Sequence, residues 1–215
     1  MLLILIFLLF GSYQILMHIF KDVNLVYFIQ HAIFNVHLVI QIFPDLIQTI
    51  RDPLACGIGW TSAYPIVSIL VFHIYHILIS KKLKMDEWFH HIFFCCIMPP
   101  ILILLAPYNL TNASLVFFSG IPGAVSYTLL SLVKLGKVTK LFEKRISSFL
   151  YLWIRMPALI IFAFLLLVHL VNCPGNNTPL NTVLALIGSA GIYWNGIYYG
   201  DAYSQSYNRL LTHKN

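Results

Sequence analysis

Residues 86–96 read Asp-Glu-Trp-Phe-His-His-Ile-Phe-Phe-Cys-Cys, so two adjacent histidines, His90 and His91, stand at the start of a long apolar run. A run of this kind predicts a membrane helix, in which ionisable groups usually face a cavity or a partner. A neutral imidazole can accept and donate a proton, which suits base catalysis or metal binding. The structural alternative is that both rings form hydrogen bonds between helices at the membrane interface.

The composition is typical of a polytopic membrane protein. Of the 215 residues, 60% are hydrophobic and 9% are charged, whereas soluble domains contain about 25% charged residues. We expect an all-α bundle of about seven transmembrane helices, because seven apolar runs approach the ~20 residues that cross a bilayer. The runs are residues 1–20, 23–43, 54–79, 88–106, 110–133, 147–171 and 180–200. We expect residues 1–44 to form amino-terminal spans and residues 45–210 to form the main transmembrane domain.

The basic residues predict how the chain is oriented in the membrane. Eleven of the 13 lysines and arginines fall in the loops and tail on one side of these spans, and cytosolic loops carry the excess of basic residues. We therefore expect a lumenal amino terminus and a cytosolic carboxyl terminus. The net charge of +6 reports this topology, so we expect no nucleic-acid partner.

The loops assigned to the lumen carry two further signals. Asn109, Asn112 and Asn176 each begin a glycosylation sequon, and Cys56 and Cys173 lie at lumenal ends of spans. Because the lumen permits disulfides, we expect glycosylation at the three asparagines and a bond between the two cysteines.

Polar residues from six spans share one depth, in the cytosolic half of the predicted bundle. Arg155 lies inside a span with no acidic residue to pair with, so its charge needs water or an anionic ligand. The alternative is that its side chain reaches out to lipid phosphates. The polar residues are His31, His73, His76, His90, His91, Ser126, Tyr127, Arg155, Trp194 and Asn195.

This shared depth predicts a cavity that opens to the cytosol. We expect His90 or His91 to point into it together with at least two of His73, His76, Tyr127, Arg155 and Asn195. Adjacent residues of an α-helix point about 100° apart, so we expect the other histidine to turn to a neighbouring helix. We expect no metal, because His73-x-x-His76 and the His90-His91 pair are not followed by a further histidine box.

A small-x-x-x-small pattern spans Gly196 and Gly200 in the last apolar run. Such a pattern lets helix backbones approach closely. It predicts close packing within the bundle, and a homodimer seam is the alternative.

The order of several motifs resembles the TLC domain, a family of membrane proteins that includes the ceramide synthases. The resemblance covers residues 45–210. The motifs are Arg51-Asp52-Pro53, Trp88-Phe89-His90-His91, Ser119-Gly120-Ile121-Pro122, Leu135-Gly136-Lys137, Arg155-Met156-Pro157 and Trp194-Asn195.

This resemblance implies a protein of the endoplasmic reticulum whose helices enclose a pocket for a lipid acyl chain. Residues 115–133 lack the histidine and acids that ceramide synthases carry there, and Ser68 replaces a frequent Asp. The leading hypothesis is therefore lipid sensing, transport or membrane-composition control, with membrane lipids as partners and no cofactor. The expected ligand-binding residues are His73, His76, Tyr127, Arg155, Trp194 and Asn195.

Two alternatives stay open. One is an N-acyltransferase for a sphingoid base or another amine, with acyl-CoA as co-substrate and His90 and His91 as the catalytic general base. The other is a structural or translocation-accessory membrane protein without a ligand.

Overall fold

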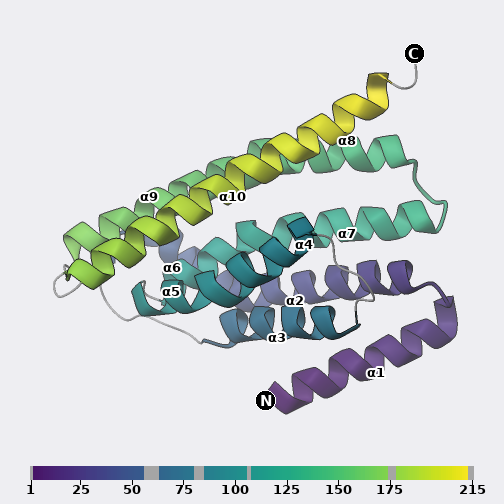
Figure 1. Ribbon diagram of the computed structural model, residues 1–215, viewed down its shortest axis with the longest axis horizontal. Coiled ribbons are helices and arrows are strands. Elements are labelled where there is room, and N and C mark those ends of the chain that lie inside the picture. Colours follow the sequence, from purple (N-terminus) through teal and green to yellow (C-terminus); the bar gives the residue numbers. More distant parts are fainter. Residues whose placement is uncertain (1, 56–62, 80–84, 106–107, 174–177, 213–215) are drawn as a thin grey trace.

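The computed structural model describes residues 2–55, 63–79, 85–105, 108–173 and 178–212, and every regular element in these ranges is a helix (Figure 1). The α-helices are α1 (Leu2–Phe20), α2 (Val23–Arg51), α3 (Tyr64–Ile79), α4 (Met85–Phe89), α5 (Met98–Leu105), α6 (Tyr108–Leu115), α7 (Ile121–Lys134), α8 (Lys140–Leu150), α9 (Met156–Asn172) and α10 (Pro179–Thr212). Three π-helical segments lie between them: His90–Ile97, Val116–Gly120 and Tyr151–Arg155.

The π-helical segments join pairs of α-helices into continuous rods. Residues 85–105, 108–134 and 140–172 each run through one such segment without a break. Within the described residues, three helices are long and apolar enough to cross a membrane, and they are Val23–Arg51, Asn109–Lys134 and Lys140–Asn172. This is fewer than the seven spans predicted. The apolar helices Leu5–Phe20, Tyr64–Ile79 and His90–Ile101 are shorter, and α10 is long but less apolar.

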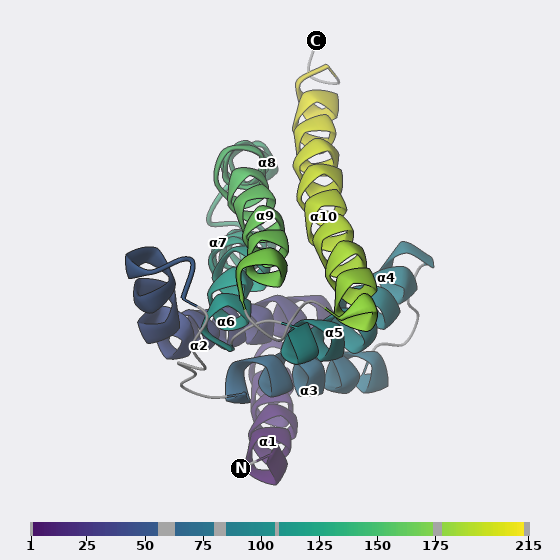
Figure 2. The same cartoon turned by 90° about the vertical axis from the view of Figure 1, so that its left-hand side faces the viewer.

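The helices form layers. In both views α1 lies on the far side of α2 and α3 from α9 and α10 (Figures 1 and 2). The α1–α2 corner, the α7–α8 turn and the carboxyl end of α10 lie together at one end of the molecule. The end of α9 and the start of α10 lie at the opposite end. Gly136 makes the α7–α8 turn possible with a φ of 68°, which glycine adopts without strain.

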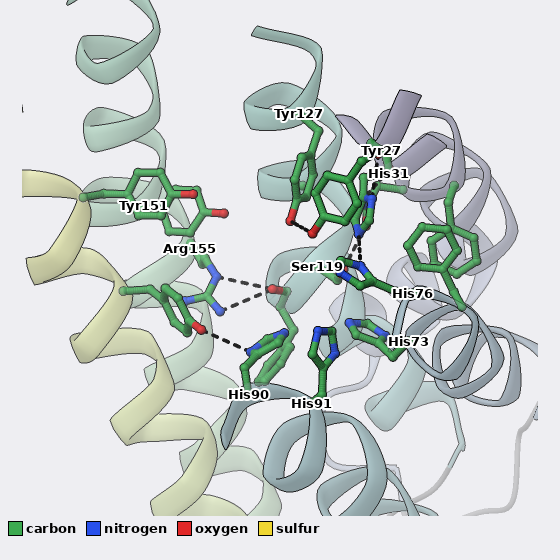
Figure 3. A pocket seen from close by; sticks show the side chains of 17 residues that line it. Tyr27, His31, His73, His76, His90, His91, Ser119, Tyr127, Tyr151 and Arg155 are labelled. Carbon is green, nitrogen blue, oxygen red and sulfur yellow. Dashed lines mark hydrogen bonds between the residues drawn. The ribbon is translucent and has the colours of Figure 1, made fainter. Parts of the chain in front are cut away.

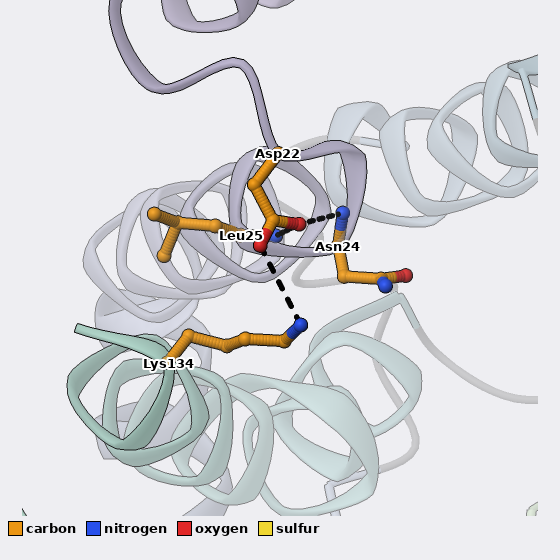
Figure 4. A network of polar contacts seen from close by, with 4 residues as sticks. All are labelled: Asp22, Asn24, Leu25 and Lys134. Carbon is orange, nitrogen blue, oxygen red and sulfur yellow. Dashed lines mark hydrogen bonds and ion pairs between the residues drawn. The ribbon is translucent and has the colours of Figure 1, made fainter. Parts of the chain in front are cut away.

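The α1–α2 corner is fixed by a helix cap (Figure 4). Asp22 Oδ1 accepts hydrogen bonds from the backbone N–H groups of Asn24, at 2.9 Å, and Leu25, at 3.2 Å. Lys134 Nζ lies 3.5 Å from Asp22 Oδ2 and ties the start of α2 to the end of α7. The bond from Leu25 N–H is the largest of the effects that lower the pKa of Asp22, and the charge of Lys134 adds to it.

Two glycines of α10 allow this helix to pack closely against α9. A Cβ added at Gly196 would lie 3.3 Å from Leu159 Cβ, and one at Gly200 would lie 3.3 Å from Met156 Sδ. Ser189 Oγ, on the same helix, donates to the Ala163 carbonyl at 2.9 Å. The small-x-x-x-small pattern therefore packs within the bundle, and this face is not available as a homodimer seam.

At the opposite end of the molecule, the structure differs from several sequence-based expectations. Asn109 and Asn112 are buried in α6 and do not lie in a loop, and Asn112 Nδ2 donates to Asp45 Oδ2 at 2.7 Å. The expected loop position of these two asparagines is therefore wrong, and their glycosylation stays a prediction. Asp45 itself is buried inside α2, which runs unbroken through residues 44 and 45, where the first spans were expected to end.

Two other expectations fall wholly or partly outside the described residues. Asn176 lies outside the described residues, so its glycosylation stays a prediction. Cys173 is buried and disulfide-bonded, while Cys56 is not among the described residues, so the pairing of these two cysteines also stays a prediction.

Candidate functional site

A cavity of about 260 Å³ lies between the layers of helices (Figure 3). Its walls come from α2, α3, α7, α10 and all three π-helical segments. The lining residues are mostly histidines, tyrosines and other polar or aromatic groups: Tyr27, His31, Phe34, Asn35, Phe72, His73, His76, His90, His91, Phe118, Ser119, Gly123, Tyr127, Tyr151, Arg155, Tyr199 and Tyr203.

Five histidine rings gather in one part of this cavity. The ring centroids of His76 and His91 lie 4.8 Å apart, those of His73 and His91 5.4 Å, and those of His73 and His90 5.7 Å. His76 Nδ1 lies 3.2 Å from His31 Nε2. Side chains from α2, α3 and the segment His90–Ile97 thus form one continuous cluster.

Backbone carbonyls determine which nitrogens of the neutral rings carry hydrogen. A carbonyl oxygen only accepts, so His31 Nδ1–H donates to Tyr27 O and His73 Nδ1–H donates to Ile69 O, both at 2.8 Å. His31 Nε2 is then an acceptor, and His76 Nδ1–H donates to it. The Nε2 atoms of His73 and His76 are left as proton acceptors. This part of the cavity can therefore take a proton from a bound amine or hydroxyl group.

His90 and His91 both line the cavity, so the expectation that one of them turns away is wrong. The physical reason is the π-helix that begins at His90, whose wider turn places consecutive side chains closer in direction than an α-helix does. His90 also contacts a neighbouring helix, because its Nδ1 lies 3.1 Å from the hydroxyl of Tyr199 on α10.

Arg155 supplies a buried positive charge at the cavity wall. Its Nε and Nη2 donate to the Phe118 carbonyl at 3.3 Å, and its Nη1 donates to the Asn195 carbonyl at 3.2 Å. Nη2 also donates to Asn195 Oδ1. The side chain is 3% exposed, so the alternative in which Arg155 reaches out to lipid phosphates is wrong. Within the described residues the ion pairs are Lys134–Asp22 and Lys144–Glu143, and neither involves Arg155.

The sequence predicts eight residues for the site. Six of them line the cavity, and two do not. Trp194 is 43% exposed and its ring stacks on Phe94 and Tyr198. Asn195 is fully buried behind Arg155 and holds that side chain in place. The six that line the cavity are His73, His76, His90, His91, Tyr127 and Arg155.

Sequence reasoning missed much of the aromatic wall. Tyr199 and Tyr203 line the cavity from α10, and their four-residue spacing from Asn195 could have placed all three on one face. Tyr27 and Tyr127, whose hydroxyls lie 3.5 Å apart, line it from α2 and α7.

A smaller apolar chamber of about 50 Å³ adjoins the polar cavity. The two share His73, His90, Phe118 and Ser119 in their walls. The chamber is otherwise lined mainly by buried apolar side chains: Ile66, Ile69, Phe94, Met98, Leu115 and Ile192. The site thus passes from polar groups to apolar ones over a short distance.

The arrangement of polar cavity, histidine cluster and apolar chamber is compatible with an amphiphilic ligand. In comparisons with known proteins, no protein-family model, curated protein or solved structure matches this chain, so membership of the TLC family stays a prediction.

Proposed function

We propose that this protein is a lipid-handling membrane protein that binds an amphiphile inside its helix bundle. The observation that carries the proposal is the polar cavity with an apolar chamber at its side. The polar wall would hold the head group, and the chamber would take the adjoining part of the chain. Ligand sites of this kind combine an apolar lining with a few placed polar groups. A structural protein without a ligand has no need of such a cavity.

We further propose that the bundle has seven spans and that the cavity opens to the cytosol from the endoplasmic reticulum membrane. The support is that the α1–α2 corner, the α7–α8 turn and the end of α10 share one end of the molecule (Figure 1). These segments contain Lys21, Lys137 and Arg209, and cytosolic ends are rich in basic residues. Tyr27 lies about one turn, and Tyr127 about two turns, from the same end. Protease protection of terminal tags tests this, and a protected carboxyl-terminal tag would contradict it.

Cross-linking with a photoactivatable long-chain lipid tests whether an amphiphile binds. Ile69 lines the chamber and is 5% exposed, whereas Ile74 on the same helix is 45% exposed. In lipid nanodiscs, Ile69→Trp should fill the chamber and lower labelling several-fold, while Ile74→Trp leaves it unchanged. Thermal melts of both variants establish that they are folded. Equal labelling of the two folded variants would show that the lipid binds elsewhere.

A second candidate, N-acyl transfer from acyl-CoA to an amine, is favoured by the fixed histidine tautomers. The amine nitrogen would attack the thioester carbonyl carbon and pass its proton to the Nε2 of His73 or His76. The carbon–sulfur bond then breaks, and the thiolate takes a proton to leave as a thiol. His90 and His91, the predicted bases, lie beside these rings.

Thiol release and amide formation with purified protein test this candidate. The double variant His73→Ala, His76→Ala should abolish thiol release and amide formation, and His37→Ala, which changes an exposed histidine outside the cavity, should abolish neither. If the wild-type protein binds lipid and forms no amide from acyl-CoA and long-chain amines, binding without catalysis is the function.

A further inference from the structure

We propose that the cavity selects an amphiphile whose head group is an oxyanion, a carboxylate or a phosphate, bound through the charge of Arg155. This deepens the proposed function and rests on it. Arg155 is the one permanently charged side chain among the residues that line the cavity. An anion placed there would gain an attraction that a neutral or cationic head group cannot.

The hydrogen bonds of Arg155 orient its charge without neutralising it. Its four N–H···O contacts go to the Phe118 carbonyl and to the carbonyl and side-chain oxygen of Asn195, all of them neutral acceptors. These contacts leave one Nη1–H without an acceptor among the described residues. The four contacts hold the guanidinium in position before a ligand binds. A buried cation without a counter-ion is costly, and an anionic ligand would remove much of that cost.

The aromatic walls do not favour a cationic head group. Quaternary ammonium groups bind over aromatic faces, but the faces near the charge are already occupied. The guanidinium carbon of Arg155 lies 5.1 Å from the ring centroid of Tyr199, 5.2 Å from that of Tyr151 and 5.5 Å from that of Phe118. A second cation beside it would be repelled.

Asn195 offers a change that cancels the charge and keeps the shape of the site. Its Oδ1 accepts from Arg155, whereas its Nδ2 is buried and has no hydrogen-bond partner in the described part of the chain. Asn195→Asp therefore replaces an unused N–H group with a second carboxylate oxygen. The new carboxylate would pair with Arg155 and remove the positive potential of the cavity. Asn208→Asp adds the same charge at an exposed position of α10 and is the matched control.

The test is displacement of a fluorescent long-chain lipid from the full chain in nanodiscs. The competitors share one chain and differ in the head group: palmitate, palmitoyl lysophosphatidate, hexadecanol and hexadecylamine, with inorganic phosphate alone as a further arm. We expect palmitate and lysophosphatidate to bind at least about tenfold more tightly than hexadecanol, a difference of about 1.4 kcal/mol. Displacement by inorganic phosphate alone would identify free phosphate as the source of the oxyanion.

The expected results distinguish failure of the oxyanion proposal from failure of lipid binding itself. Asn195→Asp should lose the preference for anions and still bind hexadecanol, and Asn208→Asp should keep the preference. Equal affinity for palmitate and hexadecanol in the wild-type protein, or tighter binding of hexadecylamine, would overturn the oxyanion proposal and leave lipid binding intact. Failure of every competitor would instead refute the proposed function itself.

Discussion

Gly123 on α7 lies against Asn35 in the wall of the cavity, and Gly123→Ala tests this packing directly. A Cβ at this position would lie 2.5 Å from Asn35 Nδ2, 2.7 Å from its Cγ and 2.9 Å from its Oδ1. Asn35 is 2% exposed. Its Nδ2 donates to the His31 carbonyl, and its Oδ1 accepts from Ser119 Oγ, both at 2.8 Å. The added methyl group must therefore displace an amide that bridges α2 and the Val116–Gly120 segment.

The cost follows from these contacts. Overpacking a filled interior costs about 1–3 kcal/mol, and each side-chain hydrogen bond lost between membrane helices costs about 0.6 kcal/mol. Alanine regains about 1 kcal/mol in helix propensity over glycine. We expect a net loss of about 1–3 kcal/mol in the free energy of unfolding. At about 2–4 °C per kcal/mol for a chain of this size, the melting temperature should fall by about 2–12 °C.

Thermal melts in nanodiscs, followed by circular dichroism, measure this loss. Gly11→Ala is the control, because a Cβ there meets no atom within 4 Å and gains the same helix propensity. In an Asn35→Ala background the clashing atoms are gone, so Gly123→Ala should cost much less than it does alone. The reasoning is refuted if Gly123→Ala melts no lower than Gly11→Ala, or if its cost is the same in both backgrounds.

Two further predictions concern packing and pH. Gly196→Ala forces a methyl group against Leu159 and should lower the melting temperature by a few degrees, while light scattering records an unchanged oligomeric state; dissociation of a dimer would contradict the packing seen here. Asp22 has a pKa below its ordinary value of 3.8, so its contribution to stability is complete above pH 3.8 and is lost as the pH falls through the lowered pKa. Melts from pH 7 to about pH 2 should show Asp22→Asn less stable than wild type at neutral pH and equal to it in acid, and a constant difference across that range would refute the linkage.

Much of the helical layout follows from apolar runs alone. The runs predicted at residues 110–133 and 147–171 lie within the observed rods 108–134 and 140–172. The sequence misleads around Asn109 and Asn112, where Tyr-Asn-Leu-Thr-Asn-Ala-Ser has the composition of a loop. This segment is helical because Asn112 is buried against Asp45, and Asp45 lies far away in the sequence.

The sequence predicts the level along the helices at which the site residues lie, but not the side to which each of these side chains points. Equal distance from the span ends brought His73, Tyr127 and Arg155 to one level, and these residues do line one cavity. Trp194 and Asn195 are both expected at the cavity, but adjacent residues of an α-helix point about 100° apart, so this expectation does not determine which side of α10 faces the cavity. The structure turns Tyr199 toward the cavity and Trp194 away from it.

The π-helical segments give this chain an unusual sensitivity to insertions and deletions. Each segment contributes cavity residues, such as His90, Phe118 and Arg155. A π-helical turn behaves as an α-helix that has gained a residue. Deleting one residue from Val116–Gly120 would convert the wide turn into a regular α-helical turn and leave α6 and α7 in nearly their present orientation. Phe118 and Ser119 lie in this turn and line the cavity, so the change of one residue in length would alter the cavity wall at this point.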